Sequence, residues 1–387
     1  MKLIEKLDLV FRSIVNEVDI DKDTVQRLGL NNQGTYFKTN KVLALSGFRS
    51  KMAAFVLRYF FVSLIAIILC NFTSFIRLFL TLFLHRRSFS GPTLIPLCSN
   101  VHSLSNFNFS IDEFNPSSSM EEPIYYKSLP SYACAIPRLR VMYCLCVLPF
   151  ALLYILYKTL GSKSSCKTSY LVNSYDLLEL LVFSEFALSL NNTDANIITD
   201  IHCQRWLYIC ASYNGLKVKI VQHGFISDSI ILTHRIPCVG TVVLYDQCYQ
   251  KMFDKFLDSQ EYKVGDFVLP TYNLDIFDGV FSVLLISNPL KTEQEYRLLE
   301  ALSSRVPEIK LIYRPHPRFS DNAMSSEIII SNEILIDTST HFPNVDIVLN
   351  TGSFLGVRYQ AAGYKVIEVD EKWNSIVSEV QSITSLS

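Results

Sequence analysis

Between Thr24 and Ile111 the chain has no acidic residue, although this stretch carries nine lysines and arginines. Charged residues make up only 18% of the whole sequence and apolar residues 49%, whereas soluble proteins average about 25% charged residues. The net charge of −1 therefore conceals a strongly basic and apolar N-terminal part. Because its basic residues are interleaved with long aliphatic runs, we favour an anionic membrane surface over nucleic acid as its partner.

Several motifs that define common functions are also missing. The sequence has no P-loop, no Gly-x-Gly-x-x-Gly and no suitably placed Asp-x-Asp, so we expect neither a metal nor a cofactor. The ten cysteines include no Cys-x-x-Cys pair, and Cys70, Cys144, Cys146 and Cys210 lie in apolar runs that suit the reduced thiol. We therefore predict a reducing, cytosolic environment. The charged segment Met1–Asp21 predicts a short amphipathic helix and not a secretory signal.

Long uncharged segments are what the N-terminal half does contain. Tyr59–Ile76 lies between Arg58 and Arg77, and Val141–Tyr157 lies between Arg140 and Lys158. Both are close to the shortest length that spans a bilayer, about 17 residues. They are either buried core helices or membrane-associated segments. We favour membrane association for the region 1–90, but positive charge on both sides of each segment leaves orientation and spanning open.

From Tyr170 onward, short apolar strands alternate with helices, which predicts parallel α/β architecture. We expect two Rossmann-like domains facing a cleft, at 91–265 and 266–387, preceded by apolar helices. Ser88–Ser131 is predicted to be mainly loops, and Ser259–Gly265 is interpreted as a polar segment. The predicted helices are Tyr175–Leu190, Cys203–Tyr213, Thr292–Ser304 and Ser353–Ala362. The predicted strands are Thr93–Leu97, Ala195–Asp200, Lys217–Val221, Thr241–Tyr245, Val280–Ile286, Ile309–Tyr313, Glu327–Ile330, Ile334–Ile336, Asp346–Leu349 and Lys365–Val369.

Two histidines follow predicted strands directly. Ligands of open α/β sheets bind at the carboxyl ends of the strands, where these residues are expected. His316 is held between Pro315 and Pro317, which restrict the backbone on both sides, and the neighbouring Arg314 favours a phosphate nearby. His223 precedes a glycine that permits close approach of a ligand, and a neutral imidazole can accept a proton from a hydroxyl. The alternatives are an incidental surface histidine and a core histidine bonded to a carbonyl.

Polar residues at other strand ends complete the candidate site. Thr351 and Ser353 lie at a predicted helix start, where free N–H groups and the helix dipole suit a phosphate, although such residues also cap helices for structural reasons alone. Glu368 ends the following strand and is a candidate for binding a ribose. Asp200 and His202 are candidates on the acceptor side, with helix capping as the alternative for Asp200.

These clusters resemble a known pattern. A strand followed by His223-Gly224, a strand followed by Arg314-Pro315-His316-Pro317, and Thr351 or Ser353 at a helix start are similar to bacterial GT-B transferases of surface polysaccharides. These include polysialyltransferases, capsule Kdo transferases and CDP-glycerol glycerophosphotransferases. The resemblance covers Tyr170–Asp370 and implies that His316, Thr351 and Ser353 bind the phosphate and ribose of a CMP-linked donor. The acidic Asp/Glu-Gly motif of the sialyltransferases is not evident in the first α/β block, because Asp278-Gly279 leads into the second.

The sequence thus predicts a metal-independent, inverting glycosyltransferase on the cytoplasmic face of the bacterial inner membrane. Its donor would be a nucleotide sugar and its acceptor a lipid-linked oligosaccharide of O-antigen or capsule synthesis, with no nucleic acid involved. His223 would act as the base, while His316, Arg314 and the helix start at Thr351–Ser353 would stabilise the departing phosphate. Two alternatives remain open: a transferase of glycerol or ribitol phosphate, and a non-enzymatic membrane scaffold.

Overall fold

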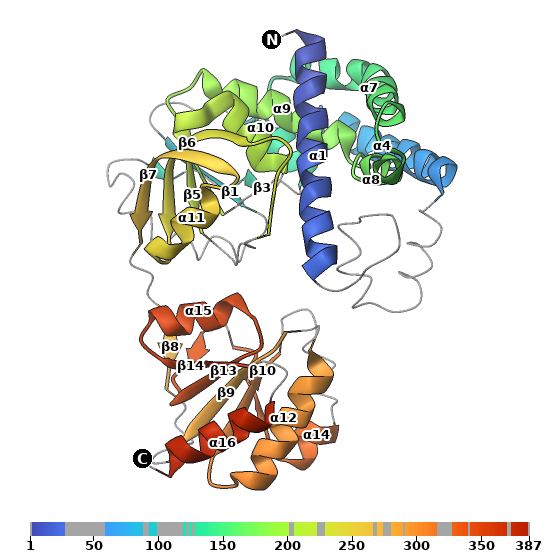
Figure 1. Ribbon diagram of the computed structural model, residues 1–387. Helices are drawn as coiled ribbons and strands as arrows, with labels where there is room; N and C mark the ends of the chain where they lie inside the picture. Colours follow the sequence, from blue (N-terminus) through green and yellow to red (C-terminus); the bar gives the residue numbers. More distant parts are fainter. Residues whose placement is uncertain are drawn as a thin grey trace. The chain divides into compact units, whose positions relative to one another are not determined.

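The computed structural model describes residues 2–27, 59–87, 93–98, 119–120, 124–125, 128–200, 205–222, 229–265, 269–273, 280–288, 291–315, 327–339, 341–369 and 373–385. The chain divides into two compact units, Met1–Gly265 and Asp266–Ser387 (Figure 1). Both are mixed α/β structures built on parallel sheets, as the alternation of helices and strands predicts. The pairing of two Rossmann-like domains across a cleft stays a prediction, as do the three regions 1–90, 91–265 and 266–387.

The first unit contains a parallel sheet and helices that are distributed along its whole sequence. Its helices are α1 (Leu3–Arg27), α4 (Phe60–Thr81), α6 (Leu129–Ala133), α7 (Arg138–Leu160), α8 (Ser164–Val172), α9 (Leu177–Asn191), α10 (Arg205–Asn214) and α11 (Gln250–Phe253), with short 3-10 turns η2 (Gly215–Lys217) and η3 (Gln247–Tyr249). Its strands are β1 (Thr93–Cys98), β2 (Ser119–Met120), β3 (Ile124–Tyr125), β4 (Asn196–Thr199), β5 (Val218–Val221), β6 (Ile236–Leu244) and β7 (Leu257–Val264).

The strand order of the first sheet is β2-β1-β4-β5-β6-β7, with β3 also beside β1, and all pairs are parallel. The order reverses between β1 and β4, because β2 and β3, which follow β1 in the sequence, pair with β1 on the side away from β4. Helix α10 packs on β5 and β6, and α9 packs on α10. Eleven of the 15 residues of α9 are buried, as expected for a helix that is apolar on all sides. Tyr132, Phe183 and Trp206 form an aromatic cluster in this core.

The second unit is smaller and has a more regular topology. Its strands are β8 (Thr271–Tyr272), β9 (Ser282–Ile286), β10 (Lys310–Arg314), β11 (Leu335–Ile336), β12 (Phe342–Pro343), β13 (Ile347–Asn350) and β14 (Lys365–Glu368). Its helices are α12 (Thr292–Arg305), α14 (Glu327–Ser331), α15 (Phe354–Ala361) and α16 (Trp373–Thr384). The main sheet has the order β11-β10-β9-β13-β14, all parallel. This is the order 3-2-1-4-5 of the Rossmann fold.

Both faces of this second sheet are covered by apolar residues. One cluster joins the sheet to α12, α14 and α16 and includes Leu298, Leu302 and Val377. A second cluster, on the face covered by α15, includes Leu284, Val348 and Tyr359. Figure 1 shows α15 and the α12–α16 pair on opposite sides of the strands. Burial on both faces explains why β9, β10 and β13 are continuous apolar runs without polar alternation.

Most of the predicted elements are confirmed to within a few residues, one interpretation is wrong and one is incomplete. Glu327–Ile330 was expected to be a strand and is the start of helix α14. Ser259–Gly265 was expected to be a polar segment, but most of it belongs to β7, which pairs in parallel with β6. The N-terminal amphipathic helix is longer than expected, and it packs along α8, α9 and α10 in the first unit.

Candidate active site

The candidate donor side lies at the carboxyl ends of the strands in the second unit. Strand β9 lies between β10 and β13, so the order of the sheet reverses between β9 and β13, where ligands of such sheets bind. Ser287 and Asn288 follow β9, and Thr351 follows β13. The Asn288 side chain donates a hydrogen bond to the Thr351 carbonyl oxygen at 3.2 Å. The two loops that border the reversal point are therefore tied to each other.

A buried carboxylate, Glu295, connects the loops at this edge through hydrogen bonds. It extends from the first turn of α12 and is fully buried. It accepts hydrogen bonds from the Ser287 hydroxyl at 2.8 Å, the Asn288 N–H at 2.6 Å and the Tyr313 hydroxyl at 3.0 Å. Burial raises the pKa of Glu295, and the hydrogen bonds offset part of that effect. Sequence reasoning missed this residue, although Thr292-x-x-Glu295 has the spacing of a capping box and therefore marks a carboxylate at a helix start.

Thr351 belongs to the same internal network. Its hydroxyl lies 2.7 Å from Glu295 Oε1 and 2.8 Å from the Ile286 carbonyl oxygen, and the residue is buried. The side chain is thus satisfied by the protein. What remains for a ligand at this position is the backbone, and donor binding by the Thr351 side chain stays a prediction.

Ser353 caps helix α15 as the sequence predicts. Its side chain accepts a hydrogen bond from the Leu355 N–H at 3.3 Å, and its own N–H donates to Asn350 Oδ1 at 2.8 Å. The preceding Gly352 has φ +96°, a conformation that other residues adopt only with strain. Asn350 also donates to Glu368 at 2.7 Å, so the predicted ribose ligand, which is exposed, lies beside the helix start.

Arg314 is held mainly by protein groups. Its guanidinium forms an ion pair with Asp337 and donates to the carbonyl oxygens of Ser339 at 2.8 Å and His341 at 3.0 Å. It also lies 4.5 Å above the centre of the Phe342 ring. These contacts occupy both terminal nitrogens and fix the segment that follows β11. Donor binding by Arg314 therefore stays a prediction, and its observed contacts are structural.

The candidate acceptor side lies in the first unit and contains two unusual polar groups. Asp200 directly follows β4 and is 5% exposed, and neither of its carboxylate oxygens has a hydrogen-bond partner among the described residues. Gln222 directly follows the neighbouring strand β5 and is fully buried. Its Oε1 accepts from the Tyr245 N–H at 3.0 Å, whereas Nε2 has no partner in the described part of the chain. Buried polar groups are rarely left unsatisfied, so this pair calls for an explanation.

The three predicted histidines lie outside the described residues. His202 is two positions beyond Asp200, His223 is next to Gln222, and His316 is next to Pro315, the last described residue after β10. Their roles stay predictions. Among the residues described, no group of three His, Cys, Asp or Glu side chains could hold a metal ion.

Comparison with known proteins identifies no family. No protein-family model matches the sequence, and no curated protein matches it. Among solved structures the chain is similar to TarM, with a TM-score of 0.34 and 12% identical residues. The match covers 53% of this chain, which spans about half (51%) of TarM. At this TM-score the likeness supports no argument about activity.

Proposed function

We propose that the protein is an inverting glycosyltransferase of bacterial surface-polysaccharide synthesis, at the cytoplasmic face of the inner membrane. It would move a sugar from a nucleotide donor, expected to be CMP-linked, to a lipid-linked oligosaccharide of O-antigen or capsule. The observation that carries the proposal is the Rossmann strand order of the second unit. It brings the ends of β10 and β13 to one edge, separated only by β9. Two strand spacings are about 10 Å, which suits a nucleotide phosphate between the segment carrying His316 and the start of α15.

In the proposed reaction the acceptor hydroxyl attacks the anomeric carbon of the donor sugar. His223 takes the hydroxyl proton, and the bond from the sugar to the nucleotide phosphate breaks. His316 and the positive end of the α15 helix dipole stabilise the negative charge on the departing phosphate, the kind of contribution that makes oxyanion sites effective. A single displacement inverts the anomeric centre. The Asp200 carboxylate and the Gln222 amide nitrogen, which have no hydrogen-bond partner among the described residues, supply hydrogen-bonding capacity for acceptor hydroxyls.

A panel of CMP-, UDP- and GDP-sugars, together with CDP-glycerol, tests this proposal. We expect one nucleotide sugar to raise the thermal unfolding temperature and to be consumed when a lipid-linked oligosaccharide is added. Consumption of CDP-glycerol or CDP-ribitol instead would establish the polyol-phosphate alternative. Absence of stabilisation by every nucleotide would favour the non-enzymatic scaffold and reject the transferase.

A further inference from the structure

Helix α4 has its polar and apolar faces reversed relative to a helix of a soluble protein. Of its buried residues, Ser63, Asn71, Ser74 and Thr81 are polar. Ile67 and Leu78 are buried as well, but most of its large apolar side chains are turned outward and are about half to three-quarters exposed. They recur with helical spacing along one side: Phe61, Ile65, Ile68, Phe72, Ile76 and Phe79. Contiguous exposed apolar surface of this kind marks an interaction site.

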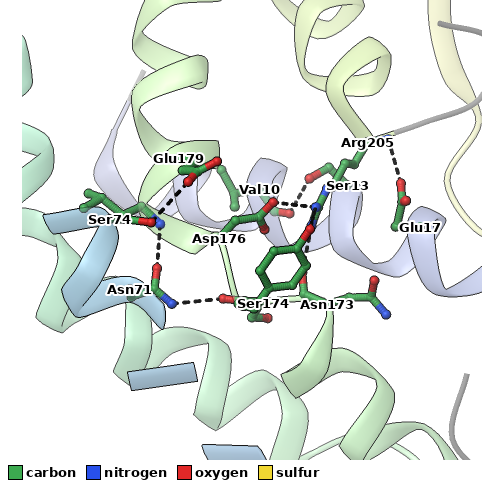
Figure 2. A network of polar contacts seen from close by, with 12 residues as sticks. Val10, Ser13, Glu17, Asn71, Ser74, Asn173, Ser174, Asp176, Glu179 and Arg205 are labelled. Atoms are coloured by element: carbon green, nitrogen blue, oxygen red, sulfur yellow. Dashed lines mark hydrogen bonds and ion pairs between the residues drawn. The ribbon is translucent and has the colours of Figure 1, made fainter. Parts of the chain in front are cut away.

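Polar contacts hold α4 on the body of the first unit (Figure 2). The Asn71 side chain donates to the Ser174 carbonyl oxygen at 3.1 Å and accepts from the Leu178 N–H at 2.8 Å. The Ser74 hydroxyl donates to Glu179 at 3.1 Å. The start of α9 therefore has one of its N–H groups satisfied by α4. A helix that left this position to cross a bilayer would abandon these bonds and expose Asn71 and Ser74 to hydrocarbon, which is costly.

Helix α7 contributes a second exposed apolar face. Its inner residues pack on α8 and α9, whereas Leu139, Phe150, Leu153 and Tyr157 are more than half exposed. Both α4 and α7 contact α8 and α9, and Figure 1 shows α4, α7 and α8 gathered on one side of α1. By length and composition alone, α4 and α7 could each cross a membrane. Their packing on shared neighbours instead suits two helices lying on a surface.

The charges around the exposed apolar faces of α4 and α7 indicate which kind of partner binds them. Helices α4, α7 and α8 contain no acidic residue, and the exposed cations nearby are Arg77, Arg87, Arg138 and Lys163. Cations bordering an apolar helix face match a bilayer with anionic headgroups. A second copy of this chain would place like charges against one another and is disfavoured.

We propose that the outer faces of α4 and α7 form one docking surface for an anionic lipid bilayer, and that α4 lies in the membrane interface without crossing it. This inference rests on the packing of the first unit and is independent of the proposed transferase activity. A monotopic anchor would keep the first unit beside the membrane, where a lipid-linked acceptor is found.

The depth of two positions on α4, Phe61 and Phe72, and of Phe83 just beyond its end separates a surface helix from a spanning one. Single cysteines replace Phe61, Phe72 or Phe83 in a protein whose other exposed cysteines are serine, and each carries a spin label. The protein is bound to vesicles of phosphatidylcholine and phosphatidylglycerol. A surface helix places all three labels at similar, shallow depth. A spanning helix places Phe72→Cys about 15 Å deeper than the other two, which would overturn the proposal. Labels that all remain in water would overturn it as well.

Vesicle flotation with matched variants tests the face itself. The double variant Phe72→Ser/Phe79→Ser removes two side chains from the docking surface, and we expect at least about a tenfold loss of partitioning. The control, Leu216→Ser/Ile330→Ser, removes two side chains of comparable exposure elsewhere and should bind as the unmodified chain does. Vesicles without anionic lipid should bind more weakly. Equal binding by both variants, or loss of self-association instead of lipid binding, would overturn the proposal.

Discussion

At the scale of single residues, Thr351 and Asp200 stand in contrast. The Thr351 hydroxyl is satisfied by Glu295 and the Ile286 carbonyl. Asp200 is buried as well, but its carboxylate has no partner within the described part of the chain. A buried carboxylate without a partner is costly to maintain. Asp200 is therefore the described residue of the candidate site whose chemistry is least explained by the fold.

The first residue prediction concerns His316. If it contacts the departing phosphate, His316→Ala should lower turnover on the order of 10²–10³-fold, the effect of losing one preorganised donor. The thermal unfolding temperature should hardly change, because the residue lies in a predicted loop. Turnover with saturating donor is the measurement, and His341→Ala, a second histidine of the same unit, serves as the control. Near-normal turnover of a folded His316→Ala protein would remove His316 from the mechanism.

The second residue prediction identifies the base. A general base contributes about 10²–10⁴-fold, and with His223 in this role the rate should fall as the pH drops through the histidine pKa, normally near 6.5. His223→Ala should abolish this acidic limb and leave donor affinity mostly intact, whereas Asp200→Asn should mainly raise the acceptor KM. Rate profiles against pH for both variants decide the matter. If Asp200→Asn abolishes turnover while the rate of His223→Ala still falls at acidic pH, Asp200 is the base.

At the scale of elements, the sequence predicts buried strands well and edge elements poorly. Strands β9, β10 and β13 are buried and apolar on both faces, and short apolar runs of this kind predict strands of a parallel sheet. Strand β7 lies at the sheet edge with mostly partly exposed residues, so its Ser-Gln-Glu-Tyr-Lys run carries no apolar signal. The isoleucines of Glu327–Ile330 suggest a strand, but Leu335–Ile336 takes the position beside β10, and the isoleucines form a helical turn with only Ile329 buried.

The contact between α4 and α9 gives the element prediction. Burial and the nearby Asp176 raise the pKa of Glu179 from 4.5 to about 6. The folded state therefore favours the protonated carboxyl, and stability falls as the pH rises between 4.5 and 6. The difference between a pKa of 4.5 and one of about 6 corresponds to about 2 kcal/mol in the free energy of unfolding. Glu179→Gln keeps an acceptor for Ser74 and should stabilise the protein by up to about 2 kcal/mol above pH 6, with little effect near pH 4.5. Urea unfolding in detergent at both pH values measures this.

The pH-dependent stabilisation is expected because the Glu179 carboxyl group is largely buried. An exposed carboxylate is therefore the suitable control. Glu293→Gln changes an exposed residue of α12 and should leave the pH dependence as it is. A stabilisation by Glu179→Gln that is the same at both pH values would mean that ionisation of Glu179 does not limit the packing of α4.

At the scale of the whole molecule, the candidate site depends on residues that meet only through folding. The chain separates Ser287 from Thr351, and Asp200 from Gln222, and no sequence pattern indicates that Glu295 joins the first pair. Strand order decides which ends are neighbours, and the sequence predicts parallel strands without predicting their order. The apolar segments show the same limit. The sequence shows how long they are, but only the positions of the neighbouring helices show that α4 buries several polar residues and exposes most of its apolar ones.

The last prediction follows from the division into two units. The second unit, Asp266–Ser387, has apolar clusters on both faces of its own sheet, which is what independent folding requires. Expressed alone, it should unfold in one cooperative transition by calorimetry. If the donor site belongs to this unit, the fragment should also bind the nucleotide that stabilises the 387-residue chain, with an affinity within about tenfold, a difference of about 1.4 kcal/mol. A folded fragment that fails to bind this nucleotide would show that the donor site requires residues of the first unit as well.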